Sequence, residues 1–151
     1  MYTWIFGCGI VFAFYNAWGI GANDCANSFA TSVGAKVLTL KQAILVAAVF
    51  EFLGAFLMGS HVTSAIRKKI VSIDIFEDEP GALMFGMLCS NMAAGKWVNV
   101  ATYFKYPVST THSIIGAIIG FSLAYGGKDA IVWESVGFIV SDLIISLSKK
   151  R

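Results

Sequence analysis

The chain has 151 residues, of which 57% are hydrophobic and 13% are charged, and its formal net charge is only +2. With a mean hydropathy of +0.73, this composition lies outside the range of soluble domains and indicates a membrane protein. The small and scattered charge excludes a nucleic-acid-binding surface. Three cysteines, Cys8, Cys25 and Cys89, lie in apolar contexts without zinc-ligand spacing and do not predict a disulfide framework.

Five apolar segments follow one another along the chain, each close to the roughly 20 residues that a helix needs to cross a bilayer. They cover residues 1–23, 40–64, 81–104, 106–127 and 130–148. These segments lack the period-2 alternation of membrane β-strands and are rich in Gly, Ala, Leu and Ile. We therefore expect an all-α, polytopic integral membrane protein in which residues 1–151 form a single transmembrane helical unit. The charged stretch 61–80 is predicted to be an aqueous loop.

The first apolar segment ends in an unusually polar stretch, GIGANDCANSF, at residues 19–29. Gly19 and Gly21 weaken a helix, and Asn23 or Asp24 can cap a new one. We therefore predict that the helix breaks at residues 21–24. Irregular backbone at membrane depth is tolerated only inside protein or beside a water-filled cavity.

A second interruption is predicted within KYPVSTTHSIIGAIIG, residues 105–120. Pro107 disfavours helix at the residue before it, and Ser109 or Thr110 can cap a fresh helix that runs through Leu123. Two interruptions in one short chain predict broken or re-entrant helices that share one cavity.

The amino end of a helix inside a cavity offers free N–H groups and the positive end of the helix dipole, which together bind anions. Hydroxyl groups gather at the same point, and His112 adds a donor whose protonation changes near neutral pH. The residues expected to bind an oxyanion are Asn23, Asp24, Asn27, Ser109, Thr110, Thr111 and His112. Because the motif contains no Arg or Lys, the site should hold an anion moderately and release it, as a carrier requires.

Carboxylates beside an anion site are repulsive unless a cation or a proton lies between them. Asp24 lies in the polar stretch, and Glu51 lies in the middle of the next span, where an ionised carboxylate costs about 2.5 to 3.5 kcal/mol. The residues expected to bind or couple a cation are Asp24, Asn23, Ser28, Glu51 and Ser113. Oxygen-rich ligands of this kind suit Na⁺ or H⁺, and no cofactor or metal other than a co-transported ion is expected.

Two alternatives belong to other functional classes. The first is an intramembrane hydrolase with Ser109 or Thr111 as nucleophile, His112 as base and Asp24 as orienting group. The sequence contains neither GxSxG nor HExxH, and adjacent residues at a helix start point in different directions, so we predict no enzymatic activity. The second is an anion channel-like pore, which has less need of intramembrane carboxylates.

The motifs GANDCANSF and PVSTTHS resemble signatures of the inorganic phosphate transporter (PiT) family, and residues 50–55 and 97–102 are also similar to that family. The resemblance implies cation-coupled phosphate symport, driven by Na⁺ or by H⁺. The residues that it places around substrate and cation are Asn23, Asp24, Asn27, Ser109, Thr110 and Thr111, with Glu51 in coupling. Family members carry two inverted copies of this unit, so the chain resembles the N-terminal half. A fragment, a split gene product and a homodimer all remain open at this point.

Overall fold

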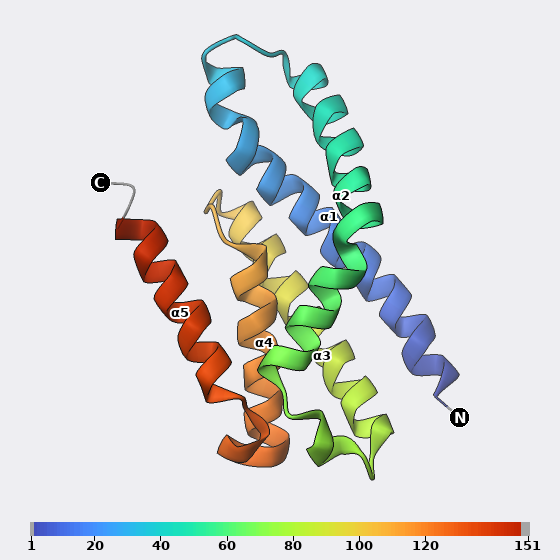
Figure 1. Ribbon diagram of the computed structural model, residues 1–151. Coiled ribbons are helices and arrows are strands. Elements are labelled where there is room, and N and C mark those ends of the chain that lie inside the picture. Colours follow the sequence, from blue (N-terminus) through green and yellow to red (C-terminus); the bar gives the residue numbers. More distant parts are fainter. Residues whose placement is uncertain (1, 149–151) are drawn as a thin grey trace.

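The computed structural model describes residues 2–148, with side chains described except at 65–69, 73, 140 and 142–148. Within this range the chain forms five α-helices and two short 3₁₀-helices and has no strand (Figure 1). They are α1 (Thr3–Gly34), α2 (Leu40–Ile70), η1 (Ile73–Phe76), α3 (Pro80–Tyr103), α4 (Thr110–Gly126), η2 (Gly127–Ala130) and α5 (Trp133–Ser148). The predicted all-α architecture is confirmed. The outermost positions of the predicted unit, 1 and 149–151, lie outside the described residues.

Two helices, α1 and α2, are long and apolar enough to cross a bilayer, over Thr3–Gly34 and Leu40–Ser64. Residues 35–39 join them into an antiparallel pair (Figure 1). At 1.5 Å per residue α1 is about 48 Å long, more than the roughly 30 Å of a hydrocarbon core. Large apolar side chains such as Trp18 and Phe56 are exposed on these helices, as expected where lipid or further protein covers them.

The start of α2 is defined by a capping box. The Oγ1 of Thr39 accepts a hydrogen bond from the backbone N–H of Gln42, and the Gln42 side chain accepts one of 2.9 Å from the N–H of Thr39. The far end of α2 differs from the prediction, because residues 61–70 continue the helix and only the residues after Ile70 leave it. The sequence HVTSAIRKKI contains no glycine or proline that would stop the helix there.

α3 and α4 form an antiparallel hairpin that lies alongside α1 (Figure 1). The contact with α1 uses small and amide side chains, since Nδ2 of Asn16 donates to Oδ1 of Asn91 at 2.7 Å. A Cβ atom at Gly95 would lie 3.2 Å from Cβ of Asn16, and one at Gly19 would overlap the amide of Asn99. Glycine at these positions therefore allows the two helices to approach closely.

The hydrophobic core lies at the base of the hairpin. Its buried members are Ile70, Val71, Phe76, Ile115 and Ile118. Backbone hydrogen bonds fix the end of α2 to the segment between η2 and α5, with the N–H of Ser72 donating to Ala130 at 3.1 Å and the N–H of Val132 donating to Ile70 at 3.2 Å. The base of the hairpin is thus anchored, whereas its turn reaches toward α1.

α1 runs without interruption through residues 21–24, so the break predicted there is wrong. The physical reason is that the glycines and polar side chains of this stretch contact other helices. Gly19 packs against α3, and the side chains of Asn23 and Asp24 bond to the α3–α4 hairpin instead of capping a new helix. The interruption that does occur is the one predicted at Pro107.

Candidate functional site

The turn of the α3–α4 hairpin meets α1 well inside the length of that helix. It contacts α1 at Asn23, which lies about 16 Å from the carboxyl end of α1 at 1.5 Å per residue. The turn therefore meets α1 within the helix and not at its end. The structure confirms the helix interruption predicted around Pro107, and a re-entrant position of the hairpin in the membrane stays a prediction.

The turn begins where α3 ends in a Schellman motif. Lys105 adopts the left-handed conformation, with φ 61°, and its N–H donates to the carbonyl of Thr102 at 2.9 Å. The N–H of Tyr106 donates to the carbonyl of Ala101 at 2.8 Å, which completes the motif. The chain is not helical through Pro107, and the next helix, α4, begins at Thr110.

α4 begins with Ser109 as its N-cap, as the sequence predicts. The Oγ of Ser109 accepts a hydrogen bond of 3.3 Å from the backbone N–H of His112. The N–H groups of Thr110 and Thr111 belong to the first turn, where helix geometry supplies no intrahelical acceptor. They point toward the amino end of the helix, where its dipole is positive and favours an anion.

Asn23 connects α1 to this turn through a fully occupied side-chain amide. It is buried, with 4% of its surface exposed. Its Nδ2 donates to Oγ1 of Thr102 at 3.0 Å and to the carbonyl of Tyr106 at 3.1 Å. Its Oδ1 accepts from the N–H of Val108 at 3.2 Å and from Nδ2 of Asn27 at 2.9 Å. Both donor hydrogens and both acceptor positions of the amide are therefore in use.

Asp24 and Thr110, both half-buried, meet directly. The hydroxyl of Thr110 donates a hydrogen bond of 3.1 Å to Oδ2 of Asp24. Oδ1 of Asp24 has no hydrogen-bond partner among the side chains described for this chain. A carboxylate is thereby held at the amino end of α4, where the helix dipole partly offsets its charge.

The other predicted residues of the hairpin lie around this contact in different roles. His112 is exposed, with Nδ1 against Oγ of Ser109. Ser113 donates its hydroxyl hydrogen to the backbone carbonyl of Ser109 at 2.8 Å. This hydrogen is therefore used within the backbone of α4. Thr111 is exposed at the start of α4. Its side chain is free to meet a ligand that approaches this helix end.

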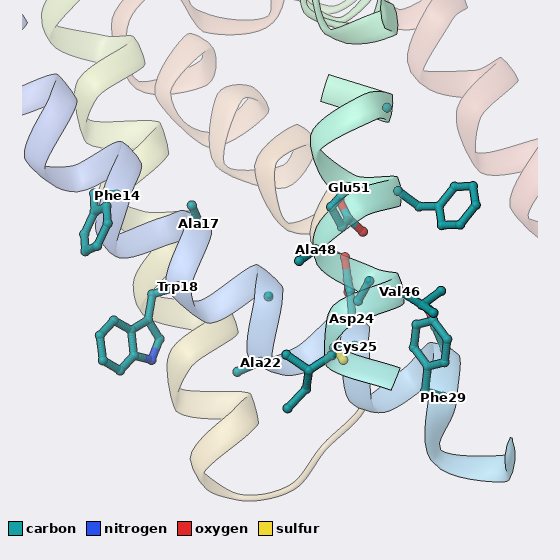
Figure 2. Close-up of a pocket in the computed structure, with 16 residues that line it drawn as sticks. Phe14, Ala17, Trp18, Ala22, Asp24, Cys25, Phe29, Val46, Ala48 and Glu51 are labelled. Atoms are coloured by element: carbon teal, nitrogen blue, oxygen red, sulfur yellow. The ribbon is translucent and has the colours of Figure 1, made fainter. Parts of the chain in front are cut away.

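A second group of predicted residues lies across α1 and α2, around a cavity of about 1260 Å³. Asp24 and Ser28 line it from α1, and Glu51 lines it from α2. Figure 2 shows the carboxylates of Asp24 and Glu51 in the same part of this cavity. Aromatic side chains, among them Trp18 and Phe50, form much of the remaining wall.

The two carboxylates occupy matching levels on the antiparallel pair. Asp24 lies about 15 Å from the end of α1, and Glu51 lies about 16 Å from the start of α2, at 1.5 Å per residue. Among the described side chains no ion pair joins either of them to a basic residue. A carboxylate within a hydrocarbon core is costly without a counter-charge.

Sequence reasoning did not identify the contacts that fix the turn to α1. Thr102 serves as acceptor for Asn23 and donates to the carbonyl of Val98 at 2.7 Å. Asn23 and Thr102 are 79 positions apart. A local pattern carries no signal for a pairing at that separation. The backbone partners at Tyr106 and Val108 are equally invisible to residue-type patterns.

The chain is similar to known phosphate transport proteins over nearly its whole length. The phosphate transporter family model matches residues 20–148. The chloroplastic inorganic phosphate transporter 2-1 of Arabidopsis thaliana is 50% identical over 137 residues, which are 91% of this chain and 23% of that protein. A sodium-dependent phosphate transporter of Toxoplasma gondii is 48% identical over 143 residues, which are 95% of this chain and 16% of that protein.

A solved structure is also similar to this chain. It is described as the sodium-dependent phosphate transporter, and it matches with a TM-score of 0.88 and 44% sequence identity. The match covers 94% of this chain and 35% of that structure. The chain thus spans about a third or less of the length of these relatives. Its helices, its two signature motifs and the family match agree, and the chain belongs to the phosphate transporter family.

Proposed function

We propose that the protein carrying this chain moves inorganic phosphate across a membrane together with a cation. The observation that carries the proposal is the hydrogen bond between Thr110 and Asp24, because it joins an anion-binding helix end to a cation-attracting carboxylate. The names of the relatives support the same reading, since two of them are described as sodium-dependent phosphate transporters. Na⁺ is therefore the first ion to test, and H⁺ the second.

In this proposal phosphate binds at the amino end of α4. The N–H groups of Thr110 and Thr111, with the side chains of Thr111 and Ser109, donate to its oxygens. Asp24 repels the same anion unless its charge is compensated. A cation between Asp24 and Glu51 removes that repulsion, so each ligand strengthens the binding of the other. Such mutual dependence is what coupled transport requires.

A hydrolase is less well supported by the geometry. The Oγ of Ser109 does contact Nδ1 of His112, as a nucleophile and its base would. The carboxylate of Asp24, however, accepts from Thr110 and so does not orient the imidazole as a triad requires. Turnover of a chromogenic ester by the purified protein would favour the hydrolase over the transporter.

A second unit completes the site in our proposal. The cavity between α1 and α2 is open to its surroundings, and large apolar side chains that line it, such as Trp18 and Phe50, are exposed. Transporters of this general kind place their sites at the interface between structural repeats. A second such unit, from the same polypeptide or from another copy, would close the cavity. Cross-linking in membranes followed by mass measurement distinguishes these two sources.

Transport in proteoliposomes tests the proposal. Uptake of radiolabelled phosphate is measured with an inward Na⁺ gradient, an inward H⁺ gradient, and neither. We expect uptake that depends on one of the two gradients and is lost in Asp24→Asn. Counterflow of labelled phosphate against unlabelled phosphate separates a carrier from a pore, because a pore shows no counterflow. Uptake that is indifferent to both gradients would contradict coupled transport.

A further inference from the structure

The contacts of Asn23 in the structure differ from the role that the sequence predicts for it. Sequence reasoning groups it with the ligands of phosphate and cation, but its amide makes four hydrogen bonds to protein. The orientation of the amide is fixed by its partners, since the carbonyl of Tyr106 can only accept and the N–H of Val108 can only donate. No lone pair or hydrogen of Asn23 remains for a ligand.

The two backbone partners lie on either side of Pro107. In an extended segment the carbonyl before a residue and the N–H after it point the same way, as toward a neighbouring strand. Asn23 meets both at once, donating to Tyr106 at 3.1 Å and accepting from Val108 at 3.2 Å. Its side chain therefore supplies the turn with the donor and the acceptor that a neighbouring strand would supply to an extended segment. Backbone groups left without a partner are costly where water cannot reach them.

We propose that Asn23 is a positioning residue, which holds the turn before α4 against α1 and thereby sets Thr110 beside Asp24, and that it is not a ligand of phosphate or of the cation. This inference rests on the proposed function for its transport readout and on the fold alone for its stability readout. Thr102 completes the arrangement, because its hydroxyl hydrogen is donated to Val98 and its oxygen is left to accept from Asn23.

Asn23→Asp separates the two roles, because a carboxylate has the shape of the amide but lacks its donor hydrogens. An ionised Asp at this position sets oxygens against the carbonyl of Tyr106 and the Oγ1 of Thr102. A protonated Asp restores one donor and one acceptor. The stability and the uptake of the variant should therefore be low at about pH 8 and recover at about pH 5.5, as the buried acid gains its proton.

Thermal unfolding without phosphate and without Na⁺ is the first readout. A positioning role predicts that Asn23→Asp lowers the melting temperature relative to the unchanged protein at about pH 8 and that much of the loss is regained at about pH 5.5. A ligand role predicts no loss when no ligand is present, and that result would overturn the proposal. This readout stands even if the protein proves not to transport phosphate.

Phosphate uptake at the same two pH values is the second readout, normalised to the unchanged protein at each pH. We expect uptake to fall about tenfold in Asn23→Asp at high pH, as the loss of about 1.4 kcal/mol would give, and to recover at low pH. Asn23→Ala should show the loss without the recovery. Gln42→Glu serves as the control for the change from amide to carboxylate, since Gln42 is exposed at the start of α2 and its side-chain oxygen accepts from the N–H of Thr39, as a carboxylate can. Near-normal uptake by Asn23→Asp at high pH with an altered Na⁺ requirement would establish a cation ligand instead.

Other titratable groups near this point are the same in every variant compared. On the hairpin they are Lys96, Tyr103, Lys105, Tyr106 and His112, and on α1 and α2 they are Asp24, Cys25 and Glu51. Normalisation at each pH removes their contribution. Should Asn23→Asp fail to insert, Thr102→Val and Thr102→Ser replace it, because only serine keeps the acceptor. Equal melting temperatures and equal uptake in these two variants would contradict the proposal.

Discussion

The hydroxyl of Thr110, the first residue of α4, donates a hydrogen bond of 3.1 Å to Oδ2 of Asp24 on α1. This contact joins two helices whose contributing residues are 86 positions apart. It brings the positive end of a helix dipole to a carboxylate. In the proposed function, an anion at the helix end and a cation at the carboxylate share one small region, so each is expected to affect the binding of the other.

Removing the hydroxyl of Thr110 should weaken transport. Thr110→Val keeps the shape of the side chain and loses the donor to Asp24, whereas Thr110→Ser keeps the donor. We expect Thr110→Val to reduce phosphate uptake about tenfold, since a hydrogen bond to a charged group is worth about 1.5 to 3 kcal/mol, and Thr110→Ser to remain near normal. Initial rates in proteoliposomes measure both. Equal rates for the two variants would contradict a role for the hydroxyl, because only serine keeps it.

Neutralising Glu51 should uncouple uptake from the cation. Glu51 lines the same cavity as Asp24, and glutamine keeps its size while removing the charge that attracts Na⁺ or carries H⁺. We expect Glu51→Gln to insert normally and to lose most of the cation-dependent component of uptake. Glu77→Gln, in the acidic connection before α3, is the control and should have no effect. An unchanged response of Glu51→Gln to the cation gradient would remove Glu51 from the mechanism.

Asp24 should also discriminate phosphate from sulfate. Monohydrogen and dihydrogen phosphate carry an O–H group that can donate to a carboxylate oxygen, whereas sulfate at neutral pH can only accept. Oδ1 of Asp24 has no partner within the described part of the chain and can accept such a bond. In equilibrium binding to the purified protein, displacement of labelled phosphate by sulfate should be weak in the unchanged protein and stronger in Asp24→Asn. Strong sulfate competition in both proteins would contradict this origin of selectivity.

Enlarging Gly86 should destabilise the hairpin. A Cβ atom at Gly86 would overlap the ring of Phe121 on α4, so Gly86→Val must displace that ring or push α3 and α4 apart. We expect a loss of about 1 to 3 kcal/mol in stability, as overpacking usually costs, seen as a lower melting temperature in detergent. Gly7→Val is the control, because a Cβ at Gly7 meets no described atom within 4 Å. A shift of equal size in both variants would mean that helix propensity, not packing, causes it.

The sequence predicts most of the helices because each follows from local chemistry. Apolar runs of spanning length predict the helical segments, and Pro107 with Ser109 predicts the interruption before α4. Local reasoning fails at residues 21–24 because glycines and amides have two uses that look alike in sequence. In α1 they serve contact between helices, with Gly19 against Asn99 and Asn23 against the turn.

In the candidate site, too, the residue types are predicted from the sequence and the contacts between helices are not. The residue types at Asp24, Thr110 and Glu51 indicate anion and cation chemistry. The structure hydrogen-bonds Asp24 to Thr110 and places it on the same cavity as Glu51. What the sequence does not reveal is which polar residue holds the others in place. Asn23 and Asn27 look alike as ligands, but only the three-dimensional contacts show that Asn23 is buried and fully bonded.

Phosphate at the amino end of α4 and a cation at Asp24 are proposed to bind in mutual dependence. Isothermal titration of phosphate into the purified protein, with and without Na⁺, measures this directly, and the same titration is repeated with H⁺ as the varied ion. We expect the cation to raise the affinity for phosphate at least about fivefold in the unchanged protein, a coupling of about 1 kcal/mol, and we expect Asp24→Asn to abolish the increase. An increase of the same size in Asp24→Asn would contradict this proposal.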